Sequence, residues 1–201
     1  MAPILILFSA LRSSRGAGSE TQKYETLFKK GSFEIRHYPP AGMASVEMKG
    51  KYDRMKTPGF KMLAGYIFGG NNQNKRISMT TPVRVSEEGG TGKMSFVMPS
   101  EFKRENLPKP ENEKIMLHET EPVYVAALHF GGFSNDKKIE IKKEELKHQL
   151  AKLGIKHSSR FEYLGYSAPS KLVNRRNEVI VFLDNFNPDS LKTIDQRIDE
   201  A

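Results

Sequence analysis

The middle of the chain begins with an alternating hydrophobic pattern that predicts a β-strand over residues 32–38. Because successive side chains of a strand point to opposite faces, Phe33, Ile35 and His37 share one face. The Pro39-Pro40 pair ends this segment, since proline cannot donate a hydrogen bond to a neighbouring strand. The sequence therefore predicts a short strand with a histidine at the end of its apolar face.

A second candidate strand covers residues 42–48, and after it the repeat changes from two residues to three or four. This spacing predicts an amphipathic helix that has Pro58 in its first turn and ends at Gly69. Its apolar positions are Phe60, Leu63, Ala64 and Ile67.

Alternation returns over residues 76–85, where Pro82 indicates a bulge or a sheet edge. Residues 87–92 are rich in glycine and acidic residues and predict a hairpin loop before a strand over 93–98. The proline-rich and charged segment 101–113 is the best candidate for a linker within the chain.

The second half of the chain repeats this order of patterns. A residue among 134–136 can cap a helix that runs to about Leu153, and Gly154 supplies its end. The buried stripe of this helix is Ile139, Leu146, Leu150 and Leu153. The predicted strands of this half are 115–119, 123–130, 161–167 and 178–183.

These elements predict an α+β fold made of two ββαββ units, with one helix packed on each half of a single curved sheet. We expect one domain over residues 23–184, with pseudo-repeats at about 23–100 and 114–184. Residues 1–22 are expected to be a disordered arm or a degraded targeting segment, and 185–201 a peripheral tail.

Composition excludes several kinds of site. The 201 residues include no cysteine, so disulfides, thiolate nucleophiles and cysteine-bound metals are excluded. The net charge of +8 comes from 32 basic residues interspersed with 24 acidic ones, and we expect no nucleic-acid binding because no recognition motif accompanies it. The apolar run at residues 4–8 is too short to span a membrane. We expect a cytoplasmic location, or export if this run is a signal segment.

Candidate chemistry is sparse. His37 and His129 each lie beside apolar residues of a predicted strand and are either hydrogen-bonded histidines at the edge of the core or ligands of a haem iron. Glu47 and Glu178 are the carboxylates on strands that an enzyme could use, but no nucleophile–base pair is evident. The basic segment 171–178 is either a clamp for an anionic group or a polar loop.

Four stretches, taken in order, resemble the SOUL haem-binding protein family. Their most characteristic motifs are Phe33–Arg36, Ile77–Val83 and Arg175–Glu178. The four stretches are 24–46, 59–83, 122–134 and 164–183.

The resemblance implies a distorted antiparallel β-barrel of two repeats with two packed helices. It also implies non-covalent, non-catalytic binding of haem or another tetrapyrrole in a shallow apolar cleft. His37 matches the position of an axial iron ligand in some members, while Lys171 and Arg175 would hold the propionates. Met62 and Leu63 would line the cleft.

Two departures from the family bear on this reading. Met43 and Ile180 stand where animal relatives commonly have tryptophan, which removes aromatic surface for stacking on a flat ligand.

The leading hypothesis is a monomeric haem or tetrapyrrole carrier, and the alternative is a haem-independent module that binds a protein partner. An enzyme is the third hypothesis.

Overall fold

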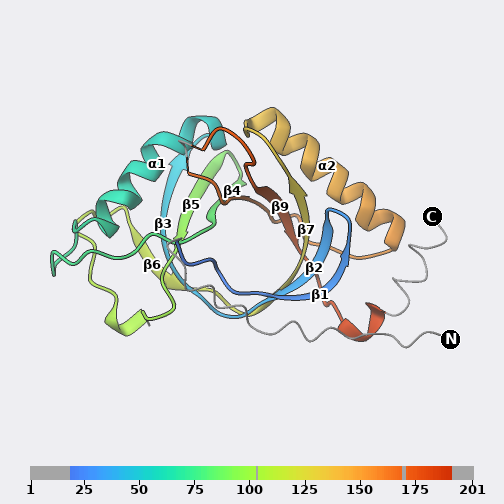
Figure 1. Ribbon diagram of the computed structural model, residues 1–201, viewed down its shortest axis with the longest axis horizontal. Helices are drawn as coiled ribbons and strands as arrows, with labels where there is room; N and C mark the ends of the chain where they lie inside the picture. The colour runs from blue at the N-terminus through green and yellow to red at the C-terminus, as the bar shows by residue number, and fades with distance from the viewer. Residues whose placement is uncertain (1–18, 103, 169–170, 192–201) are drawn as a thin grey trace.

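The computed structural model of the protein describes residues 19–102, 104–168 and 171–191 and arranges them as nine strands and two long helices (Figure 1). The elements of the first half are β1 (Glu25–Lys30), β2 (Phe33–Tyr38), β3 (Gly42–Lys49), α1 (Tyr52–Ile67), β4 (Val83–Glu88) and β5 (Thr91–Val97). Those of the second half are β6 (Met116–Glu119), β7 (Val123–Phe130), α2 (Asp136–Leu153), β8 (Phe161–Gly165) and β9 (Asn177–Phe182).

All nine strands belong to one antiparallel sheet in the order β1-β2-β7-β9-β8-β4-β5-β3-β6. The two halves meet where β4 pairs with β8. The first strand of each predicted unit pairs with the other unit, because β2 lies beside β7 and β6 lies beside β3. The two halves are therefore joined at three places in one sheet.

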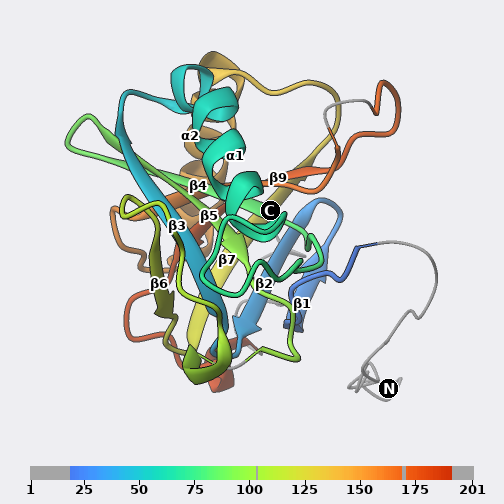
Figure 2. The same ribbon diagram turned by 90° about the vertical axis from the view of Figure 1, so that its left-hand side faces the viewer.

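The predicted α+β class and the doubled ββαββ order are confirmed. The sheet is strongly curved but remains open, with β1 and β6 as its edges. Figure 2 shows that the two helices lie on the same side of the sheet, one behind the other in that view. The expected barrel is thus a curled sheet whose outer face carries both helices.

Helix α1 starts earlier than predicted, at Tyr52, so Pro58 lies inside it rather than in its first turn. Pro58 has no N–H to donate to the carbonyl of Arg54. The helix continues because its buried residues extend one turn further back, to Met55, which is fully buried. Burial of that extra turn against the sheet therefore outweighs the lost hydrogen bond.

Helix α2 begins and ends as predicted. The Asn135 side chain caps it by accepting a hydrogen bond from the Lys138 N–H at 2.8 Å. Gly154 has φ +66°, the left-handed conformation that glycine adopts without strain.

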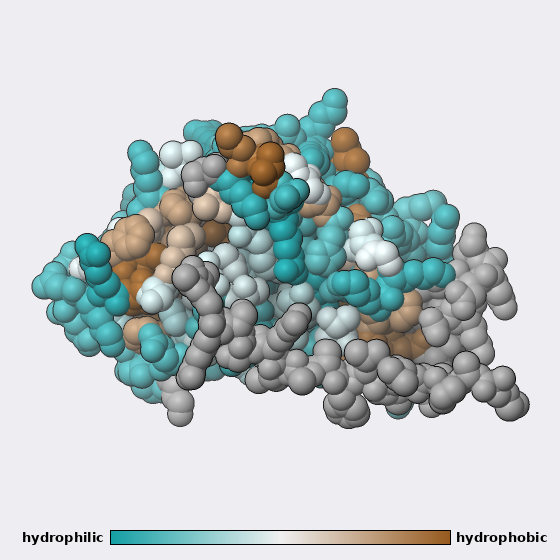
Figure 3. Space-filling view, viewed as in Figure 1, coloured by the Kyte–Doolittle hydropathy of each residue, from teal (hydrophilic) through white to brown (hydrophobic). Residues whose placement is uncertain are grey.

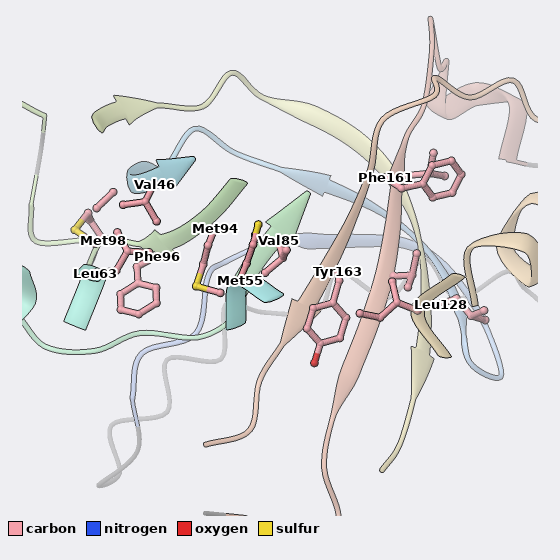
Figure 4. Packing of buried hydrophobic residues seen from close by; sticks show 14 of the residues in the cluster. Val46, Met55, Leu63, Val85, Met94, Phe96, Met98, Leu128, Phe161 and Tyr163 are labelled. Atoms are coloured by element: carbon pink, nitrogen blue, oxygen red, sulfur yellow. The ribbon is translucent and has the colours of Figure 1, made fainter. Parts of the chain in front are cut away.

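The outer face of the sheet and the two helices enclose the main hydrophobic core. Methionines fill much of the space under α1, as Figure 4 shows for Met55, Met94 and Met98. The inner face carries a smaller cluster made of Tyr38 of β2 and of residues on strands of the second half, such as Val125 and Ile180, together with many charged side chains.

Three segments differ from the prediction. Residues 76–82 are mostly outside the sheet, and β4 begins only after Pro82. Residues 101–113 do not form a free linker, because Phe102 and Leu107 are buried in the core. Strand β1, which the sequence analysis missed, is a partly exposed edge strand with a weak hydrophobic pattern.

The predicted N-terminal arm lies outside the described residues except for 19–22, which are attached to the sheet. Gln22 donates its backbone N–H to the Thr81 carbonyl at 2.7 Å and is buried. Most of the predicted tail, from 192 on, lies outside the described residues too. In the part of the chain that the structure describes, neither helix combines the length and hydrophobicity needed to cross a membrane.

Candidate functional site

The curled sheet surrounds a cavity of about 500 Å³ on its inner face. Tyr38 of β2 and His118 of β6 both line it, although these strands are second and last in the sheet order. The curvature of the sheet therefore brings strands from its two ends to one site. A volume of this size lies within the usual range for small-molecule pockets.

A buried ion pair lies in the wall of the cavity. Arg84 Nη2 is 2.6 Å from the Glu162 carboxylate, and both side chains are less than a tenth exposed. Arg160 approaches the other oxygen of Glu162 at 3.2 Å. Burial raises the pKa of Glu162, but the charges of Arg84 and Arg160 outweigh this effect and hold the pKa below its ordinary value.

Polar side chains from β3, β5 and β6 continue this wall. Ser45 Oγ lies 2.7 Å from Ser95 Oγ and 2.9 Å from His118 Nε2. Burial, together with the nearby charge of Lys93, lowers the pKa of His118. The imidazole is therefore neutral at neutral pH. The two serines lie within paired strands, where the backbone N–H groups already serve the sheet, so the arrangement offers no oxyanion hole.

A second buried charge network lies farther along the inner face. Arg36 is fully buried and contacts Glu178 at 2.6 Å and Glu34 at 2.7 Å. His129 lies between the two carboxylates, 3.2 Å from Glu34 and 3.1 Å from Glu178. His129 is thus a hydrogen-bonded histidine at the edge of the core, which was one of the two readings of the sequence.

The outer surface near the start of both helices carries a different kind of site. The loop between β8 and β9 exposes Leu172 and Val173, whose exposed fractions are 73% and 72%. Figure 3 shows a hydrophobic patch at the top centre, in the region where the β8–β9 loop passes between α1 and α2 in Figure 1. Phe133, 58% exposed, lies under the guanidinium of Arg175 at 4.6 Å.

Arg175 also holds the β8–β9 loop in shape. Its Nη1 donates hydrogen bonds to the carbonyls of Ala168 and Lys171 at 3.0 and 2.5 Å. Its buried Nε–H has no hydrogen-bond partner among the described residues. Arg175 thus shapes a polar loop, which was one of the two readings of this segment, and the anion clamp stays a prediction.

The structure does not bring all the predicted site residues together. His37 is half-buried, and its ring lies 4.9 Å from that of Tyr124 at the start of β7. Arg175 lies two residues before Asn177, which pairs with Phe130 at the other end of β7. Six residues of strand separate these ends, about 20 Å. His37 and Arg175 therefore lie at opposite ends of β7 rather than side by side.

The remaining predicted residues fall into two environments. Lys171 is exposed on the β8–β9 loop. Leu63 is fully buried in the core under α1, whereas Met62 is only partly buried. Leu63 thus packs α1 against the sheet, and Met62 is the residue of this pair with surface available to a ligand.

The pattern of the sequence did not indicate the cavity residues Arg84, Ser95 and Glu162. A charge at every second position of a strand normally indicates a solvated face. The one available signal was that such charges recur on several predicted strands, including Arg36 and Glu178, which allows them to pair if the sheet curls.

Comparisons with known proteins agree with the family resemblance. The family model described as SOUL heme-binding protein matches residues 19–182. Heme-binding protein 2 of Homo sapiens is 32% identical over 164 residues, covering 77% of this chain and 80% of the relative. Heme-binding protein 1 of Sus scrofa is 27% identical over 185 residues, covering 86% and 97%.

Solved structures with much lower identity share the fold. A hydrolase from Listeria innocua matches with a TM-score of 0.56 at 9% identity, over 77% of this chain and 93% of that one. The C-terminal domain of EcmrR matches with a TM-score of 0.58 at 7% identity, over 81% and 99%. At these identities the likeness concerns the fold alone.

Proposed function

Because the chain belongs to the SOUL haem-binding protein family, we propose that it binds haem or a related tetrapyrrole without covalent attachment and without catalysis. Carrying or buffering such a ligand is the role this implies. The relatives named heme-binding proteins 1 and 2 support the ligand class. The observation in the structure that carries the proposal is the exposed apolar surface of the β8–β9 loop, bordered by basic side chains.

The β8–β9 loop fits the chemistry of a porphyrin. Leu172 and Val173 supply apolar surface, and burying it against a flat ligand is favourable by about 25 cal/mol per Å². Lys171 is exposed beside them, and its ammonium group can pair with a carboxylate. The loop therefore combines an apolar contact with a group suited to propionates.

His37 defines an alternative position. Its ring lies beside that of Tyr124, which is 5.5 Å from the ring of Phe186, and these rings could contact a porphyrin that His37 ligates through iron. This position and the loop are at opposite ends of β7, and we treat them as alternatives for one haem. We place the ligand at the loop, where both apolar surface and cations are exposed.

A haemin titration followed by Soret absorbance tests both the function and the position. We expect saturable one-to-one binding that Leu172→Ser with Val173→Ser weakens by about tenfold and Lys171→Ala weakens by about threefold. Phe68→Ser is the matched control, because Phe68 is 61% exposed at the far end of α1. The control should bind haemin like the wild type.

His37→Ala distinguishes the alternative position. If this variant loses the Soret shift while the loop variants keep it, the ligand lies beside Tyr124 and our placement is wrong. If the wild type shows no saturable shift, haem binding itself is refuted. A protein partner captured equally with and without haem would then support the interaction-module alternative.

A further inference from the structure

We infer that the cavity inside the curled sheet is a second binding site, selective for a planar organic cation such as a guanidinium or amidinium attached to an aromatic ring. This function is separate from the proposed haem site, which lies on the outer surface at the β8–β9 loop. Three observations carry the inference. They are the charge of the lining, a guanidinium group of the protein itself that lies at the opening of the cavity, and aromatic residues in the lining.

The charge of the lining is opposite to that of the whole protein. The chain has a net charge of +8, whereas the cavity is lined by five carboxylates and three basic side chains. The carboxylates are Glu47, Glu88, Glu119, Glu121 and Glu162, and the bases are Arg84, Lys93 and Arg160. A lining of one prevailing sign concentrates ligands of the other sign in the cavity. The cavity therefore favours a cation over the dianionic haem.

Most of this negative charge is available to a ligand. Glu47, Glu88, Glu119 and Glu121 are exposed at the rim, and no ion pair joins any of them to another side chain within residues 19–102, 104–168 and 171–191. Glu162, deeper in the wall, already serves Arg84. A cation that enters thus meets free carboxylates first and a shared one at the bottom.

Arg160 shows what kind of cation the mouth accepts. Its guanidinium lies 4.0 Å from the centroid of the Phe182 ring and 3.2 Å from a Glu162 oxygen. The Arg160 side chain is nevertheless 61% exposed, so it can turn toward the solvent without disturbing the packing of the core. A ligand guanidinium can replace it on the same ring and carboxylate, which are the two contacts that recognise such a group.

The inner wall supplies a place for the aromatic part of the ligand. The half-buried ring of Phe182 lines the cavity, and Tyr38 and Met43 form the wall behind it, with exposed fractions of only 2% and 3%. Thioether and aromatic groups make favourable contacts with aromatic rings. The preferred ligand is therefore a cation with a ring, rather than a small ammonium ion.

Calorimetric titration of the full chain with phenylguanidinium tests the inference, with neutral phenylurea and anionic benzoate as comparison ligands of similar shape. We expect phenylguanidinium to bind at least about tenfold more tightly than either comparison ligand. Equal binding of phenylurea, tighter binding of benzoate, or no heat with phenylguanidinium would each overturn the inference.

Two variants locate the site. Arg160→Ala removes the internal competitor and should tighten phenylguanidinium binding by about fivefold. Neutralising the rim by Glu47→Gln, Glu119→Gln and Glu121→Gln together should weaken it by about fivefold. The control is Glu105→Gln, Glu111→Gln and Glu113→Gln, which changes the net charge equally at exposed positions away from the lining. If the control weakens binding as much as the rim variant, the selectivity belongs to the whole molecule and the inference fails.

Haemin separates this inference from the proposed function. Protein saturated with phenylguanidinium should bind haemin with unchanged affinity, because the two sites lie on different faces of the sheet. Displacement of phenylguanidinium by haemin would assign the cavity to haem and overturn the inference. Loss of haemin binding in the loop variants with phenylguanidinium binding intact would support it.

Discussion

Asp53 and Asp136 each accept a hydrogen bond from the backbone N–H of the other residue, at 2.9 and 3.1 Å. Asp53 is in the first turn of α1 and Asp136 is in the first turn of α2. The first N–H groups of a helix have no partner within it, and carboxylates are favourable at this end. Each helix therefore helps to cap the other, which ties the two halves together on the outer face.

We predict that Asp53→Ala lowers the free energy of unfolding by about 1 kcal/mol, the usual effect of losing a helix cap. The hydrogen bond from the Asp136 N–H, followed by that from Lys56, lowers the pKa of Asp53, so the ionised form is the one that caps. Urea unfolding at pH 7 measures the effect. Asp184→Ala, at another exposed position, is the control and should leave stability unchanged.

The buried ion pair between Arg36 and Glu178 leads to a larger prediction. Both side chains are completely buried, so Glu178→Gln leaves the Arg36 charge with less compensation. We expect a loss of about 3 kcal/mol in the free energy of unfolding. The double variant Arg36→Met with Glu178→Met should recover part of it, because apolar side chains need no charged partner. A double variant less stable than Glu178→Gln would contradict this account.

Acid should destabilise the protein through its buried carboxylates. Burial raises the pKa of Glu178, but hydrogen bonding and charge from Arg36 outweigh it, and the folded pKa is below the ordinary value of 4.5. Glu34 and Glu162 are shifted in the same direction. A lowered folded pKa adds stability that is fully present above about pH 4.5 and declines as the pH falls toward the folded pKa values.

Urea unfolding midpoints measured between pH 7 and pH 3 test this dependence. We expect the urea concentration at the midpoint to decrease as the pH is lowered below 4.5. This decrease should be less steep in Glu178→Gln than in the wild type. Glu111→Gln, a change at an exposed site, should follow the wild-type curve. A midpoint that stays constant down to pH 3 would show that these carboxylates add no stability.

Two glycines should respond to alanine in opposite ways. A Cβ at Gly92 would lie 1.8 Å from Met55 Sδ and 2.6 Å from the Gly50 carbonyl oxygen, so Gly92→Ala should cost about 2 kcal/mol or more. A Cβ at Gly65, within α1, meets no atom among the described residues within 4 Å. Gly65→Ala should therefore stabilise the protein by about 0.5–1 kcal/mol. Thermal unfolding of both variants decides the question, and equal effects would contradict the packing described around Met55.

The inner face shows where prediction from sequence reached its limit. Glu34 and Arg36 alternate with Phe33 and Ile35, a pattern that indicates a strand with one solvated face. The strand is present, but Glu34 and Arg36 are buried at 3% and 0% exposure. Local alternation reports that the two faces differ, and it carries no information on whether a curled sheet closes over the polar one.

The candidate site shows the same limit. The family motifs contain His37 and Arg175 and led to one predicted haem site that used both. Strand register then places them at opposite ends of β7. Membership of a motif is a property of the sequence, whereas distance between motifs depends on which strands pair and in which direction.

The amino-acid sequence by itself determined both helices, the doubled ββαββ order, a helix cap among residues 134–136 and the end of α2 at Gly154, because these depend on side-chain periodicity and local backbone preference. Only the tertiary structure decided that the first strand of each ββαββ unit pairs with the other unit, and that Arg84 and Glu162 line one cavity. Contacts of this kind join residues far apart in the chain. They are selected by the burial and pairing of the whole sheet, which no local pattern records.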